Sequence, residues 1–279
     1  MYFLNINKPK GLTSFDVIHK LRKRLNIKQI GHSGTLDPLA DGVLQVAVGS
    51  ATKLLDYLPS DKTYIAKFKL GFITDTFDSE ADEQFVKSPN VLKDELIKCL
   101  KSFEGKSLQI PPKYSAIKIG GKKLCDLARK NIEIKINPRE IEIYSIELID
   151  FNDYDLATIK VSSKKGVYIR SLINDIGLKL GCGAYLKELT RIKAGNFKIE
   201  NSNNLDDEKF IEIDPLSALD MDNIEISEDE LNKILNGNFI QNKTGLNRCK
   251  ILLTFNKKLV SVAEISDNLI KPKKNFKGV

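Results

Sequence analysis

Apolar residues recur at helical spacing near the start of the chain and alternate at strand spacing soon after. Ile18, Leu21 and Leu25 fall on one face, which predicts a helix over about residues 14–26. Residues 63–70 alternate strictly between apolar and polar, as a half-buried strand does. The same criteria predict strands over 43–48, 139–150, 156–162 and 166–170, and helices over 91–103 and 171–180.

Two loops interrupt this pattern. Residues 31–42 contain three glycines and Pro38, and they lead directly onto the apolar strand 43–48. A loop in that position is a good platform for a functional site. Residues 104–116 form a second, proline-containing loop. On the predicted strand 166–170, Tyr168 and Arg170 share one face at its C-terminal end.

The amino-acid composition of the chain changes after residue 200. Residues 201–208 are polar and acidic, which is typical of a linker or peripheral segment. A capping box from Ser227 to Glu230 then predicts a short helix, and strands over 250–255 and 259–265 flank a turn. We therefore expect two domains, a large one over 1–221 and a small one over 222–279.

Charge and composition narrow the class of protein. The chain has 44 Lys and Arg against 37 Asp and Glu, and its net charge of +7 favours a polyanionic partner. The helix at 14–26 carries Lys20, Arg22, Lys23 and Arg24, and charge alone does not distinguish a solvated face from one that contacts phosphates. No apolar run approaches the ~20 residues of a membrane span, so we expect a soluble, cytoplasmic protein without membrane association.

The residues that usually bind metals or form disulfides are sparse. Four cysteines (Cys99, Cys125, Cys182 and Cys249) are scattered without a CxxC pair, which favours reduced thiols. The only histidines are His19 and His32, and no HExxH motif accompanies them. We therefore expect no metal site.

Residues 31–44, with the sequence GHSGTLDPLADGVL, are the most informative segment. This segment resembles the GHxGTLDPxAxGVL signature of bacterial TruB-type tRNA pseudouridine synthases, and the signature's Asp corresponds to Asp37. Ser33 and Asp41 depart from it, since each stands where the family more often has Thr. Further family-like segments follow in order and extend the resemblance over roughly residues 1–200: Gly49 to Lys53, Lys62 to Tyr64, Gln109 to Ala116, Gly166 to Arg170, and Gly181 to Leu189.

The resemblance implies an α+β pseudouridine-synthase fold with a mixed, largely antiparallel central sheet flanked by helices. It implies isomerisation of the T-loop uridine at position 55 of tRNA, without a cofactor because no electrons are transferred overall. Asp37 would be the catalytic carboxylate, which can attack ribose C1′ or act on the nucleotide only when it is ionised. Arg170, the residue that the family pairs with it, would favour that charged form.

The resemblance also assigns residues to binding and to proton transfer. Tyr64 would stack on the flipped base, and Tyr168 would be the catalytic phenol near C5 of uracil. His32 would support flipping by stacking within the T-loop, and Lys53 would neutralise a phosphate, although a lysine that only faces water explains Lys53 equally well. Leu189 completes the residues that we assign to substrate binding.

The expected partner is tRNA, bound at its T-stem-loop and elbow by a monomer. The C-terminal strands are similar to an abbreviated PUA domain, a small RNA-binding β module, and a plain stabilising appendage is the alternative. Two other functions compete. His32 to Gly34 is similar to the HxGH loop of nucleotidyltransferases, but Thr35 replaces the second His of that loop. An RNA-binding protein with an idle catalytic centre is the other, and opening of the tRNA elbow would also give an accessory tRNA-folding chaperone activity.

Overall fold

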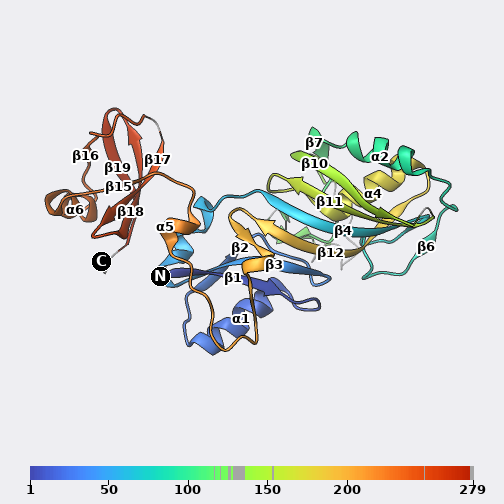
Figure 1. The fold of residues 1–279 in the computed structure, drawn as a ribbon, viewed down its shortest axis with the longest axis horizontal. Helices are drawn as coiled ribbons and strands as arrows, with labels where there is room; N and C mark the ends of the chain where they lie inside the picture. The colour runs from blue at the N-terminus through green and yellow to red at the C-terminus, as the bar shows by residue number, and fades with distance from the viewer. Residues whose placement is uncertain are drawn as a thin grey trace.

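A computed structural model describes residues 1–276 apart from residues 116, 120, 125, 126, 128–135, 153 and 248. Ala116 and Cys125, which figured in the sequence analysis, lie outside the described residues. The fold is a long mixed sheet with helices packed against it, followed by a smaller C-terminal sheet (Figure 1).

Within the described residues, ten strands form the large sheet, whose main path runs β14-β1-β3-β12-β4-β11-β10-β7. Its neighbours are antiparallel except for the parallel pairs β1 with β14 and β12 with β3, which confirms the expected mixed, largely antiparallel sheet. The strands are β1 (Tyr2–Lys8), β2 (Ile30–Ser33), β3 (Ala40–Val48), β4 (Lys62–Leu70), β7 (Gly105–Gln109), β10 (Arg139–Phe151), β11 (Leu156–Ser163), β12 (Ala184–Ala194), β13 (Phe197–Lys198) and β14 (Asn203–Asn204).

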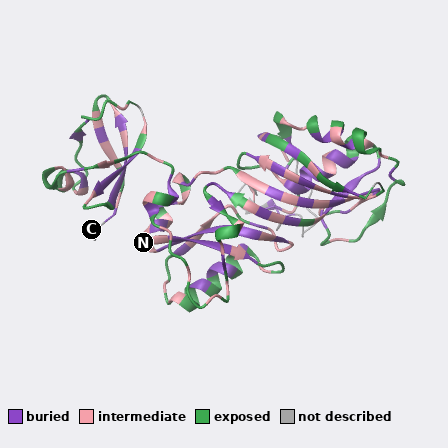
Figure 2. Ribbon diagram, viewed as in Figure 1, coloured by how far each residue is buried: buried purple, intermediate pink, exposed green. Residues whose placement is uncertain are grey.

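Helices cover the apolar faces of this sheet. The helix α1 (Ser14–Leu25) packs Val17, Ile18 and Leu21 against β1 and β3, as its spacing predicted. The helices α2 (Lys93–Lys101) and α4 (Ile169–Leu180) pack against the half of the sheet formed by β4, β10, β11 and β12. Figure 2 shows the resulting alternation of buried and more exposed positions along the strands, which β4 displays most regularly.

Two short strand pairs and three short helices complete this part of the chain as the structure describes it. They are η1 (Gly49–Tyr57), β5 (Phe72–Ile73) paired with β6 (Gln84–Phe85), β8 (Lys118–Ile119) paired with β9 (Lys122–Lys123), η2 (Ile199–Asn201) and α5 (Pro215–Ala218).

Three sequence-based expectations about elements were wrong. Residues 105–109, expected in a loop, form the edge strand β7, because pairing with β10 satisfies its backbone. Residues 166–170, expected as a strand, are not one: Tyr168 is the N-cap of α4, so Tyr168 and Arg170 do not share a strand face. Residues 203–204, expected in a linker, form β14, which pairs in parallel with β1 at the sheet's edge.

A second sheet, with the order β15-β17-β18-β19-β16, follows α5, as expected for a small C-terminal β module. One apolar cluster of this sheet is formed by residues of the C-terminal module alone. Four further residues of the module join the apolar cluster that contains Phe3 of β1; they are Leu252, Leu259, Val262 and Phe276. The two sheets therefore share buried apolar surface. The elements are β15 (Asn223–Glu225), α6 (Glu228–Leu235), β16 (Ile240–Gln241), β17 (Lys250–Phe255), β18 (Lys258–Ser266) and β19 (Leu269–Asn275). No described helix is both long and apolar enough to span a bilayer.

Candidate active site

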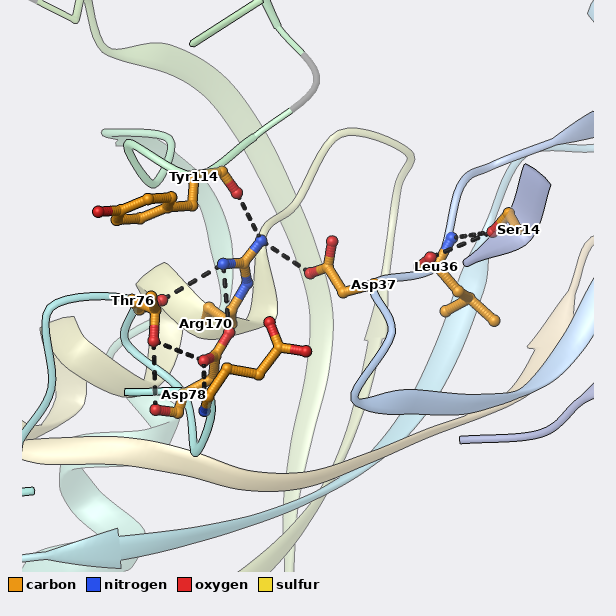
Figure 3. A network of polar contacts seen from close by, with 8 residues as sticks. Ser14, Leu36, Asp37, Thr76, Asp78, Tyr114 and Arg170 are labelled. Carbon is orange, nitrogen blue, oxygen red and sulfur yellow. Dashed lines mark hydrogen bonds and ion pairs between the residues drawn. The ribbon is translucent and has the colours of Figure 1, made fainter. Parts of the chain in front are cut away.

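Asp37 lies in the short connection between β2 and β3, and its neighbours hold this connection in place. Ser14, the first residue of α1, is buried; its hydroxyl donates to the carbonyl of Leu36 (3.1 Å) and accepts from the Leu36 amide (2.8 Å). The amide of Gly11 donates to the carbonyl of Pro38 (2.8 Å). The residues on both sides of Asp37 are thus tied to the N-terminal segment, which orients its carboxylate (Figure 3).

Arg170 lies between two carboxylates. Its Nη2 is 2.8 Å from Oδ2 of Asp37, and its Nη1 is 3.2 Å from Oδ2 of Asp78. Nη2 also donates to the carbonyl of Tyr114 (2.9 Å) and Nη1 to that of Thr76 (3.3 Å), as Figure 3 shows. Only 5% of Arg170 is exposed, and four partners from three segments fix the orientation of its guanidinium.

Asp78 was missed by the sequence analysis. Its side chain is fully buried, and its Oδ1 accepts hydrogen bonds from the hydroxyl of Thr76 (2.6 Å) and the amide of Glu80 (3.0 Å). The sequence Thr74 to Asp78 is typical of a turn, and a carboxylate in a turn usually faces solvent. Nothing in the pattern of residues indicated that this carboxylate would be buried beneath Arg170.

The charges around Asp37 oppose one another. Burial raises the pKa of Asp37, the Arg170 guanidinium lowers it, and the Asp78 carboxylate raises it further. Arg170 shares its charge between two acids, so it compensates Asp37 only in part. The net effect is a raised pKa, so the Asp37 carboxylate is more basic than a free Asp side chain.

Tyr168 reaches the same cleft from the N-terminus of α4. Gln109, at the end of β7, brackets its backbone: the Gln109 amide group donates to the carbonyl of Tyr168 (3.1 Å) and accepts from its N–H (2.9 Å). The hydroxyl of Ser171 donates to the carbonyl of Ile110 (2.8 Å). Burial raises the pKa of the Tyr168 phenol, so the phenol stays protonated at neutral pH.

These side chains line one cleft of about 460 Å³, a size that admits a small ligand or a single nucleotide. Asp37, Tyr64, Tyr168, Arg170 and Leu189 all contribute to its wall, as expected for a shared site. Arg191, on the strand adjacent to Tyr64, and Lys62 also line it; the sequence analysis had assigned neither residue to the site.

Two predicted binding residues do not line this cleft. His32 accepts or donates a hydrogen bond with the Thr35 hydroxyl (3.1 Å) and packs edge-on against the Phe15 ring at 5.2 Å. Lys53 is exposed on η1, with its ammonium 5.9 Å from the Phe276 ring centroid. Any contact of these residues with RNA would have to be made outside the cleft.

Asp41 also lies away from the cleft lining. It is half-buried on β3, and its charge acts on the buried Lys8, whose ammonium donates to the carbonyls of Pro9 (2.9 Å) and Leu12 (2.7 Å). Burial lowers the pKa of Lys8 to about 8, and Asp41 and Asp37 oppose that fall.

Half of the predicted basic face of α1 has a structural role. Arg22 donates to the carbonyl of Ile30 (2.8 Å), whereas Arg24 donates to the carbonyls of Leu205 and Asp207 and lies over the Phe210 ring. Lys20 and Lys23 are exposed. Among the described residues, no group of His, Cys, Asp and Glu side chains is arranged to hold a metal ion.

Chemically, the site combines a fixed, ionised carboxylate with two phenols in a partly water-excluded cleft. The carboxylate can act as a nucleophile or base, and the phenols can stack on a planar ring or donate a proton.

Comparison with known families and proteins gives an independent line of information. Residues 22–169 match the model of the TruB family pseudouridylate synthase N-terminal domain, and residues 170–236 match that of the tRNA pseudouridylate synthase B C-terminal domain. The boundary between the two matches falls at the start of α4. Because β12 follows α4 and belongs to the large sheet, both matches contribute strands to that sheet.

Curated relatives match along most of the chain. The tRNA pseudouridine synthase B of Clostridium tetani is 44% identical over 255 residues, which is 88% of each protein. That of Fusobacterium nucleatum is 44% identical over 283 residues, or 97% of this chain and 98% of the relative. Among solved structures, a chain of a Cbf5-Nop10-Gar1 complex superposes with a TM-score of 0.74 at 26% identity, covering 98% of this chain and 84% of that one.

Proposed function

The chain belongs to the TruB family of pseudouridylate synthases, and we propose that it converts the T-loop uridine at position 55 of tRNA to pseudouridine. The observation that carries the proposal is the ion pair of 2.8 Å between Arg170 and Asp37, in a cleft that Tyr64 and Tyr168 also line. A synthase needs an ionised carboxylate next to the sugar of an extruded uridine, and this cleft has the size and the groups for both.

In the proposed reaction, the N1–C1′ bond of the uridine breaks, the uracil rotates and a C5–C1′ bond forms; C5 then loses its proton and N1 takes one up, so the product is an isomer of the substrate. The Asp37 carboxylate is the group that reacts with the nucleotide at or beside C1′. Arg170 keeps it ionised and oriented, and Asp78 holds Arg170 from the opposite side. The Tyr168 phenol is placed to move the proton that leaves C5.

The uridine must leave its stack before it can react, and extrusion costs about a few kcal/mol. We assign the compensating contact to Tyr64, whose ring would stack on the uracil, with Leu189 as its apolar neighbour in the cleft. His32 and Lys53 would contact the T-loop from outside the cleft.

The proposed partner is the T-stem-loop and elbow of tRNA, bound by a monomer whose catalytic domain is residues 1–221. The module of residues 222–279 would add RNA contacts outside the chemistry, in the manner of a PUA domain. In this division the large sheet both binds the uridine and carries the reacting groups, and the C-terminal sheet contributes to binding alone.

The test is to incubate the purified protein with an unmodified tRNA transcript, without ATP or added metal, and to map pseudouridine by carbodiimide modification and primer extension. We expect a single modified position, uridine 55. A transcript with cytidine at position 55 is the matched control and should remain unmodified. Absence of pseudouridine in the first transcript, or its appearance at another uridine, would refute the assignment.

A further inference from the structure

Arg191 is a fully buried cation on β12 that makes no ion pair with any described carboxylate. Its Nε donates to the carbonyl of Val43 (2.7 Å) and its Nη2 to the carbonyl of Gly34 (2.7 Å). Within the described part of the chain, Nη1 is buried and has no acceptor in hydrogen-bond geometry, and the Tyr64 hydroxyl is the side-chain group that interacts with the guanidinium. A buried charge is costly unless it is compensated, and a neutral phenol compensates it only in part, so this cation beside the cleft requires an explanation.

Lys62 of β4 converges on the same point. A Cβ built on Gly34 would lie 3.2 Å from Nζ of Lys62 and 3.3 Å from Nη1 of Arg191, so both cationic nitrogens lie beside Gly34. The Lys62 side chain packs where a side chain at Gly34 would be, with its Cε 2.8 Å from that Cβ position, and Gly34 has a φ of +69°, so a glycine here lets Lys62 approach the backbone. Nζ of Lys62 donates to the carbonyl of Ser60 (3.1 Å) and has further donors to offer.

The position of this pair in the cleft indicates what it would contact. Asp37 and Arg170 define where the ribose reacts, and Tyr64, which is directly opposite Arg191 in the strand pairing, is the proposed platform for the base. The component of a nucleotide that then lacks a partner is its phosphate, which carries a full negative charge. Two cationic donors that meet at one point match a phosphate better than the neutral carbonyl of a base.

We propose that Lys62 and Arg191 form an anion subsite at Gly34 that binds the phosphodiester on the 5′ side of the flipped uridine. This inference rests on the proposed function, since it places one more part of the same nucleotide. The subsite anchors the backbone while the glycosidic bond is broken, so it positions the ribose relative to Asp37 during base rotation.

The electrostatics of the subsite agree with such a ligand. Burial, together with the charges of Arg191 and Lys165, lowers the pKa of Lys62 to about 8. Asp61 opposes this fall, and the exposed Asp56 also lines the cleft. A phosphate between Lys62 and Arg191 would relieve the repulsion between them.

The test is a double-mutant cycle that combines a substitution in the protein with a chemical change in the RNA. Single-turnover rate and affinity are measured for the wild type and Lys62→Gln, each with a T-arm stem-loop that has either the natural phosphate or a neutral methylphosphonate 5′ to the target uridine. Lys67→Gln is the matched control, because Lys67 lies on the same strand but does not line the cleft. Arg191→Lys, with its thermal unfolding recorded, tests the second cation.

We expect Lys62→Gln and the methylphosphonate each to reduce the rate or affinity about 10- to 100-fold, as for loss of a hydrogen bond to a charged group. Their combination should be little worse than either alone, because both remove the same contact. Additive losses, or a methylphosphonate without effect on the wild type, would overturn the subsite. Failure of the wild type to modify the natural stem-loop would instead overturn the proposed function.

Discussion

At the scale of single residues, the proposed function predicts that the charge of Asp37 is required for chemistry and contributes little to RNA affinity. Asp37→Asn keeps the shape of the side chain and removes the reactive anion. We therefore expect no pseudouridine formation, with tRNA affinity within about tenfold of the wild type, because phosphate contacts dominate that affinity. Measurable turnover by purified Asp37→Asn would exclude Asp37 as the reacting group.

The pH dependence of the rate should report the pKa of the same carboxylate. Burial raises the pKa of Asp37, so the rate should fall on acidification with a midpoint above the ordinary value of about 3.9. The rate falls, and does not rise, on acidification because the ionised carboxylate is the reactive form and protonation lowers its concentration. Asp78→Asn removes a like charge and should move this midpoint to lower pH, while the maximal rate falls because Arg170 loses a partner. The measurement is the single-turnover rate of both proteins from pH 4 to 8, with circular dichroism as the folding control. The same midpoint in the wild type and in Asp78→Asn would contradict the prediction.

The two tyrosines should respond differently to loss of their hydroxyl groups. Tyr64→Phe keeps the stacking ring, whereas Tyr64→Leu loses a contact worth about 1–3 kcal/mol per base. Tyr64→Phe should therefore stay closer to the wild type. Tyr168→Phe should bind tRNA but react about 10²- to 10⁴-fold more slowly, as expected when a proton-transfer group is removed. A fast Tyr168→Phe together with a slow Tyr64→Phe would reverse the two roles.

At the scale of elements, the N-terminus of α4 is positioned by the end of β7. Gln109 is 3% exposed and makes both of its hydrogen bonds to the backbone of Tyr168. Gln109→Leu should lower kcat about tenfold with KM nearly unchanged, because α4 presents Tyr168 and Arg170 to the substrate. Ser107→Ala, an exposed change on the same strand, is the control. A rise in KM alone would mean that the two hydrogen bonds between Gln109 and Tyr168 support substrate binding and not catalysis.

Local patterns predicted some elements well and others poorly. The capping box at Thr13 and the apolar face of α1 are encoded within a dozen residues, and so is the hairpin of β17 and β18, whose turn residues Asn256 and Lys257 have positive φ. The strand β12 has no such local signal, because its residues are held by β3 and β4, which are distant in sequence.

The residues of the candidate site also differ in how far the sequence alone could predict them. Asp37 and Arg170 were identified from family-like segments, and the structure places them in contact. Asp78 and Arg191 were missed, because a turn carboxylate and a strand arginine acquire their roles only when tertiary packing buries them. The start of α4 was misplaced for a related reason: its N-cap, Tyr168, makes no side-chain capping bond, so the usual signal is missing.

At the scale of the whole molecule, only part of the positive charge is available to RNA. Affinity for tRNA should fall steeply with salt, and replacing both Lys20 and Lys23 by Gln should reduce the slope of log K against log salt by about 1 per lysine. Arg24→Gln should instead lower thermal stability, since Arg24 binds backbone carbonyls of the segment after β14. Binding titrations at several salt concentrations would contradict this division if Arg24→Gln changed the slope and the lysines did not.

The order of strands in the large sheet also has a consequence for the protein's synthesis. β12 lies between β3 and β4, and β14 pairs with β1, although each pair is separated by more than a hundred residues. A nascent chain that has emerged from the ribosome as far as β11 therefore exposes one edge of β4, and the part of the β3 edge formed by residues 40–42, until β12 is translated. Since β12 also carries Leu189 and Arg191, the cleft is completed by one of the last strands of the catalytic sheet to leave the ribosome. A chain released early would lack the cleft, so an incomplete product could not modify RNA.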